Sequence, residues 1–138
     1  MKKAKRPLKV DVSISLYDAV VSFYFMDTDG FIEAYRKESG ITLVEESYMT
    51  CFSGITINAE QEFKIAGSVV VFIKDFYKSF VDDAPRALSI LAHESLHSAV
   101  AIMENRGVPV TAENDEALAY LQDCIICEVL KKTRILEK

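Results

Sequence analysis

His93 and His97 are the only histidines in the chain, and Glu94 directly follows the first of them. On an α-helix, residues four apart share one face and lie about 6 Å apart along the axis. Two imidazoles so placed can bind one Zn²⁺ at about 2.0–2.1 Å each. Glu94 then stands where its carboxylate can reach a metal-bound water rather than the metal. The H-E-x-x-H spacing therefore predicts a zinc site with an acid/base beside it.

The residues around this motif carry almost no charge. From Ala87 to Met103, Glu94 is the only formally charged residue, and apolar or small residues occur on every helical face. This pattern is typical of a buried helix. A lone buried carboxylate costs several kcal/mol unless something compensates its charge, and a divalent cation would do so. A polar cluster satisfied within the core is the alternative explanation.

A catalytic zinc site needs a third protein ligand, and the next predicted helix offers one. Residues 107–110 predict a turn that lays this helix against the motif helix. Glu116 is the best third ligand, because the small Ala117 beside it permits close approach. Glu113, one turn earlier, is the alternative. Acidic residues also stabilise the first turn of any helix, so solvent exposure is the competing explanation for both.

Hydrophobic periodicity and turn residues predict the elements that must position these groups. Strands are predicted at residues 8–16, 19–26, 41–51 and 68–73, with extended chain at 55–58. The first two alternate as in an antiparallel hairpin, and the apolar run at 68–73 suggests burial on both faces. Helices are predicted at residues 31–39, from 82 or 83 to about 106, and from 111 to about 135. Residues 59–66 and 75–81 fit short helices or loops.

These elements predict an α+β fold, in which a small antiparallel or mixed sheet packs on the motif helix and the C-terminal helix. A chain of 138 residues is expected to form a single domain over residues 1–138. The basic residues before Pro7 predict a flexible tail at residues 1–7.

The amino-acid composition excludes some classes of binding partner. Half of the residues are apolar, which argues against disorder, and the net charge of −5 argues against nucleic-acid binding. The sequence contains no apolar run of about 18 residues that would indicate a membrane span. Three cysteines form no disulfide framework, and no secretory signal is visible. We therefore expect a cytoplasmic protein that has neither nucleic acid nor membrane as a partner.

Residues 93–97 (H-E-S-L-H) followed by residues 114–117 (N-D-E-A) resemble the gluzincin metallopeptidases, in which a glutamate on a following helix is the third zinc ligand. More narrowly, residues 115–120 after the motif resemble small phage- and prophage-encoded H-E-x-x-H proteins. The match covers residues 85–125. It implies a minimal zincin-like domain that hydrolyses peptides or proteins. His93, His97 and Glu116 would hold Zn²⁺, and Glu94 would take a proton from the attacking water and pass it to the leaving amine.

The chain also departs from the gluzincin pattern. Those enzymes commonly use a further histidine to stabilise the oxyanion, and none is left here. The remaining candidates are Tyr120, Tyr48, Tyr77 and Arg106, of which Tyr120 shares the helical face of Glu116. The resemblance further implies that the strand at residues 68–73 lies along the cleft and pairs with an extended peptide. A non-catalytic protein that binds a metal or a partner on the same scaffold is the alternative function.

Overall fold

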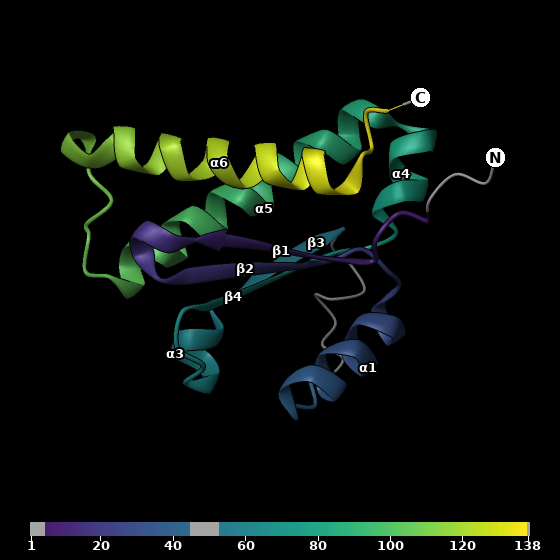
Figure 1. The fold of residues 1–138 in the computed structure, drawn as a ribbon, viewed down its shortest axis with the longest axis horizontal. Helices are drawn as coiled ribbons and strands as arrows, with labels where there is room; N and C mark the ends of the chain where they lie inside the picture. The colour runs from purple at the N-terminus through teal and green to yellow at the C-terminus, as the bar shows by residue number, and fades with distance from the viewer. Residues whose placement is uncertain (1–4, 45–52, 138) are drawn as a thin grey trace.

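The computed structural model describes residues 5–44 and 53–137, which form a four-stranded mixed sheet with helices on both faces (Figure 1). The sheet order is β1-β2-β4-β3, and its strands are β1 (Lys9–Ile14), β2 (Ala19–Tyr24), β3 (Gly54–Ile57) and β4 (Ser68–Ile73). The β1–β2 and β3–β4 pairs are antiparallel, whereas β2 and β4 are parallel. The predicted α+β class and the β1–β2 hairpin are confirmed.

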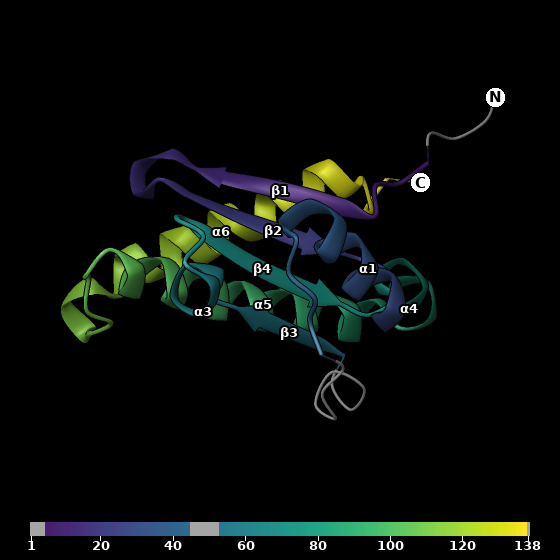
Figure 2. The ribbon, with the colours of Figure 1, turned by 90° about the horizontal axis from the view of Figure 1, so that it is seen from below.

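Helices cover the two faces unequally. The helices are α1 (Thr28–Ser39), α3 (Ala59–Phe63), α4 (Phe76–Asp82), α5 (Ala84–Asn105) and α6 (Asp115–Thr133). One face of the sheet carries α4, α5 and α6, and the other carries α1 and α3 (Figures 1 and 2). In the part of the chain that is described, none of these helices combines the length and apolarity that a membrane span requires.

Strand alternation explains why both faces are covered. Inward-facing residues of β1, β2 and β4, such as Val12, Val21 and Val71, pack in one core cluster with α5 and α6 residues. At alternate positions, Tyr24 of β2 and Phe72 of β4 point to the opposite face and form a second cluster with α1. Because β2 and β4 contribute to both clusters, the sheet lies between two helical layers, whereas the sequence predicted packing on the motif helix and the C-terminal helix only.

The element boundaries follow capping chemistry more closely than periodicity. The predicted helix at 31–39 begins earlier, at Thr28, because the Asp27 carboxylate accepts a hydrogen bond from the Gly30 N–H at 2.7 Å. The predicted start of the last helix at residue 111 was too early. A 3₁₀ turn, Ala112–Asn114, precedes α6. Of the strand predicted at 41–51, residues 41–44 are not in a strand, and 45–51 lie outside the described residues.

The motif helix α5 is anchored at both ends. At its start, Asp83 accepts a hydrogen bond from the Arg86 N–H, and a proline lies in the first turn, as predicted. Just past its end, Arg106 donates to the Tyr17 carbonyl at 2.7 Å and to the Glu60 carboxylate at 3.0 Å. The helix that carries the motif is thus tied to the β1–β2 turn and to α3.

Glu60 should make this anchor sensitive to acid. The Gly67 N–H, and then Arg106, hold the pKa of the Glu60 carboxyl below its ordinary value of 4.5. A depressed carboxyl pKa contributes stability above the unfolded-state pKa and loses it as the pH falls through the folded-state pKa. We therefore expect Glu60→Gln to unfold more easily than the wild type at pH 7. Urea titrations should show this difference shrinking below about pH 4.5. A difference that stays constant down to pH 2 would contradict the assignment.

Candidate metal centre

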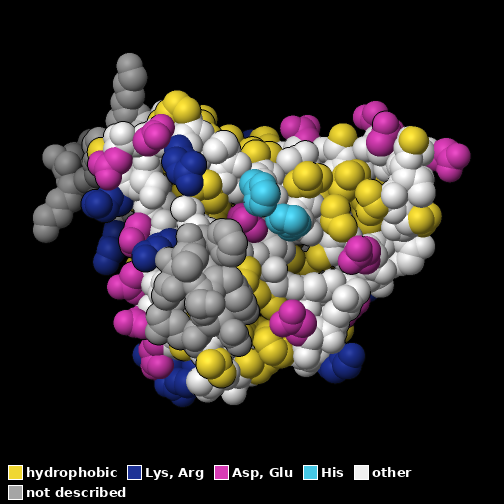
Figure 3. Space-filling view, turned by 180° about the vertical axis from the view of Figure 1, so that it is seen from behind, with side chains coloured by type: hydrophobic (Ala, Val, Ile, Leu, Met, Phe, Trp, Pro, Cys, Tyr) yellow, Lys and Arg dark blue, Asp and Glu magenta, His cyan; other side chains and the backbone are white. Residues whose placement is uncertain are grey.

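The side chains of His93, Glu94 and His97 project from α5 into environments that differ in burial. Glu94 is buried, with 5% of its surface exposed, whereas His93 and His97 are both exposed. Figure 3 shows the two histidines side by side on the surface. The prediction that α5 is buried on every side was wrong, because the sheet and α6 cover only part of its circumference. The motif therefore lies at the surface, with its carboxylate turned inward.

The two imidazoles face one another. His93 Nε2 and His97 Nε2 are 3.2 Å apart, and the ring centroids are 4.8 Å apart. Two nitrogens at this separation, each about 2.0–2.1 Å from one ion, would subtend roughly 100–106° at it, close to a tetrahedral angle of about 109°. This separation is compatible with two ligands of one tetrahedral zinc ion, and it is also that of a hydrogen bond between the two rings.

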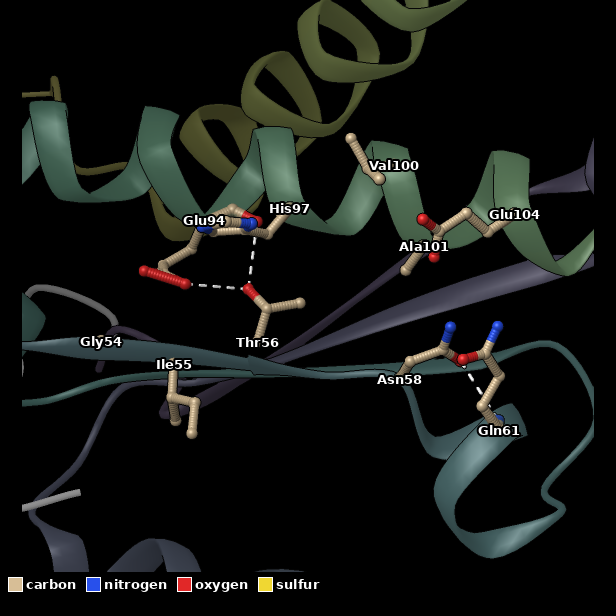
Figure 4. A pocket seen from close by; sticks show the side chains of 10 residues that line it. All are labelled: Gly54, Ile55, Thr56, Asn58, Gln61, Glu94, His97, Val100, Ala101 and Glu104. Atoms are coloured by element: carbon tan, nitrogen blue, oxygen red, sulfur yellow. Dashed lines mark hydrogen bonds between the residues drawn. The ribbon is translucent and has the colours of Figure 1, made fainter. Parts of the chain in front are cut away.

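Glu94 is held by the edge strand of the sheet. The Thr56 hydroxyl on β3 lies 2.9 Å from Glu94 Oε1 and 3.2 Å from the Glu94 backbone carbonyl. Figure 4 shows the Glu94 carboxylate directed from α5 towards β3, with the Thr56 hydroxyl directed back at it. Gly54, two residues before Thr56, also lies against this carboxylate.

Two hollows meet at Glu94 and Gly54. A hollow of about 380 Å³ extends past His97 towards Val100 and Glu104. A second, of about 350 Å³, extends past His93 towards Ile90 and Arg86. Both lie between β3 and α5 and share Gly54 and Glu94. The motif therefore lies where these two hollows, together called the groove here, adjoin.

The prediction that the strand at residues 68–73 lines this groove was wrong. β4 lies between β2 and β3, so both of its edges are paired and it cannot accept an added peptide strand. Among the described strands, β3 lies at this edge of the sheet, and it supplies Gly54 and Thr56 to the groove. The long apolar run of β4 indicates a central strand, which periodicity alone did not separate from a cleft strand.

The structure does not bring Glu116 or Glu113 to the histidines. Both glutamates are exposed, and within residues 5–44 and 53–137 no three His, Cys, Asp or Glu side chains are grouped to hold a metal. α6 does pack against α5, and Gln122 donates to the Ala92 carbonyl at 3.0 Å. Ala92, however, lies about 140° around the helix from His97. The predicted helix pair is present, but α6 contacts the flank of α5 turned away from the motif.

The candidate oxyanion groups are widely separated. Arg106 is engaged by Tyr17 and Glu60 at the far end of α5. Tyr77 donates to the Pro7 carbonyl, and burial raises the pKa of its hydroxyl to about 12. Tyr120 is 63% exposed on α6, and Tyr48 lies outside the described residues. Within residues 5–44 and 53–137, the Tyr120 hydroxyl makes no hydrogen bond, whereas Arg106 and Tyr77 are already engaged.

Thr56 and Gly54 are the site residues that the sequence did not reveal. They precede Glu94 by 38 and 40 positions, and a short Gly-Ile-Thr-Ile strand carries no chemical motif. Comparison of the chain with protein-family models, with curated proteins and with solved structures finds no match.

Proposed function

We propose that this protein is a zinc-dependent metallopeptidase whose site is formed by His93, Glu94 and His97. The observation that carries the proposal is the pair of imidazole nitrogens 3.2 Å apart, beside a buried carboxylate in the middle of a groove. Imidazole nitrogens are preferred zinc ligands, and a carboxylate next to them suits proton transfer.

Each residue has a distinct role in this proposal. His93 and His97 hold the metal through their Nε2 atoms. Zinc, when bound, supplies a Lewis acid that makes water nucleophilic near neutral pH and polarises a carbonyl. Glu94 accepts the proton of the attacking water and delivers it to the departing amine nitrogen. The hydrogen bond from the Thr56 hydroxyl restricts the rotation of that carboxylate.

The edge strand supports a peptide as the substrate. The Ser53 carbonyl accepts the Lys74 N–H at 2.9 Å, so in the antiparallel pattern Ser53 and Ile55 bond towards β4. The backbone groups of Gly54 and Thr56 then point away from β4, to the side of β3 on which no other described strand pairs. An extended peptide can add to such an edge by main-chain hydrogen bonds, which would place a peptide bond beside the motif.

Metal analysis and a peptide-cleavage assay test the proposal together. The purified protein should retain about one zinc per chain after dialysis and should cleave members of a mixed peptide library. A chelator should abolish cleavage, and added zinc should restore it. Absence of bound zinc would reject the proposal. Bound zinc without cleavage would favour the alternative, a non-catalytic protein on the same scaffold.

The third ligand is tested separately, with Glu116 as the proposed ligand and Glu113 as the alternative. The matched variants are Glu116→Ala and Glu113→Ala. Both side chains are exposed, so neither change should affect folding by more than about 0.5 kcal/mol. Loss of zinc in Glu116→Ala alone would support the ligand predicted from the sequence, although the described residues do not group Glu116 with the histidines. Unchanged zinc content in both variants would exclude α6 as the source of the ligand.

A further inference from the structure

We propose that Thr56 and Gly54 are positioning residues for Glu94: the Thr56 hydroxyl occupies one carboxylate oxygen, and the missing side chain of Gly54 leaves room for the other. This inference rests on the proposed function for its catalytic consequence. The orientation of the Glu94 carboxylate by β3 does not depend on catalysis. It assigns proton transfer to Oε2 rather than to Oε1.

The hydrogen of Thr56 has a preferred acceptor. A hydroxyl carries one hydrogen, and two Glu94 oxygens lie within reach, Oε1 at 2.9 Å and the backbone carbonyl at 3.2 Å. The carbonyl already accepts the Ser98 hydroxyl at 2.9 Å. The carboxylate oxygen is closer and carries charge, and charge-assisted hydrogen bonds are the stronger kind. Thr56 therefore donates to Oε1 and fixes the rotation of the carboxylate.

Gly54 determines the space on the other side of the carboxylate. A Cβ at residue 54 would lie 3.1 Å from Glu94 Cγ, 3.3 Å from Glu94 Oε2 and 3.3 Å from Ile90 Cγ2. These distances are tighter than ordinary carbon contacts of about 3.5–4.0 Å, so a side chain here would displace the carboxylate. Gly54 is not among the glycines with a positive φ, so this effect is separable from backbone strain.

The two contacts together leave one oxygen for chemistry. Oε1 is engaged by Thr56, whereas Oε2 faces Gly54, where the two hollows meet. Both positioning residues lie on a strand, which holds a side chain more rigidly than a loop does. A base held in one orientation is already aligned when the substrate binds, so loss of either contact should slow the chemical step more than it weakens binding.

Thr56→Val tests the hydroxyl with little change in shape, and Thr56→Ser restores it. We expect Thr56→Val to lower kcat by about 10–100-fold, as supporting groups of metal sites typically do, with KM and zinc content unchanged. Thr56→Ser should recover most of the wild-type kcat. A purely structural role for Thr56 would instead affect KM, zinc content and both variants alike.

Gly54→Ala tests the space beside Oε2, with Ile57→Val as a control on the same strand whose side chain packs in the opposite cluster and lines neither hollow. Gly54→Ala should lower kcat while zinc content stays unchanged, and Ile57→Val should behave as the wild type. Wild-type kcat in both Thr56→Val and Gly54→Ala would overturn the inference.

Unfolding free energies, which do not depend on catalysis, test this inference separately from the proposed function. In a double-mutant cycle, the unfolding free energies of Thr56→Val, Glu94→Ala and the double variant are compared. Non-additive changes would support the Thr56–Glu94 contact even if the wild type cleaved no peptide, whereas strictly additive changes would overturn it. Inactivity of the wild type would count against the proposed function alone.

Discussion

Replacing His97 with alanine is expected to abolish stoichiometric zinc binding and, with it, peptide cleavage. The expected wild-type value is about one zinc per chain, and His97→Ala should retain almost none after dialysis. The reason is geometric, because the two Nε2 atoms 3.2 Å apart can share one ion and a single exposed imidazole cannot hold it. Elemental analysis of dialysed protein measures the effect directly.

The fold should tolerate the His97→Ala change. His97 is exposed, and its hydrogen-bond contact among the described residues is with His93. Unfolding without added metal should therefore match the wild type within about 0.5 kcal/mol. Glu104→Gln is a suitable control, because Glu104 is exposed on the same side of α5, two helical turns further on. Full zinc content in His97→Ala would exclude a centre at this histidine pair.

Replacing Glu94 with glutamine should separate catalysis from metal binding. The amide has the size and shape of the carboxylate and can still accept the Thr56 hydrogen bond, but it cannot take up a proton from water. Loss of a general base costs about 10²–10⁴-fold in rate. We therefore expect kcat/KM to fall by that factor while zinc content stays at the wild-type level.

The Glu94→Gln experiment has two informative contrary outcomes. Loss of zinc would show that the Glu94 carboxylate is a ligand rather than a base. Unimpaired cleavage would show that the reaction uses another base. Glu62→Gln serves as the control here, since it makes the same chemical change at an exposed position on α3 outside both hollows and should leave the rate within a few-fold of the wild type.

Local chemistry was readable from the sequence. The i, i+4 spacing of the histidines was enough to place their nitrogens within reach of one ion, because a helix fixes the relative positions of residues one turn apart. The helix around them, from the aspartate cap to the stop near Gly107, also follows from neighbouring residues. The same holds for the β1–β2 hairpin, whose alternating residues pair with near neighbours in sequence.

Burial and long-range contacts were decided only by the tertiary structure. An apolar helix gives no indication of which flank its neighbours will cover, and α6 packs on the flank of α5 that does not carry the motif histidines. Glu116, which the sequence predicted as the third ligand, therefore does not lie in a metal-binding group of the described residues. The edge position of β3 likewise depends on pairing with β4, and a parallel crossover placed β4 inside the sheet.

The sequence by itself determined the H-E-x-x-H spacing, the helix that presents it and the α+β class, because each depends on the order of nearby residues. The tertiary structure alone decided that Glu94 is buried between α5 and β3, that Thr56 and Gly54 orient it, and that the histidines open to a groove. Side chains about 40 positions apart meet only when the strands pair and the helices pack, and no local pattern encodes which of them will do so.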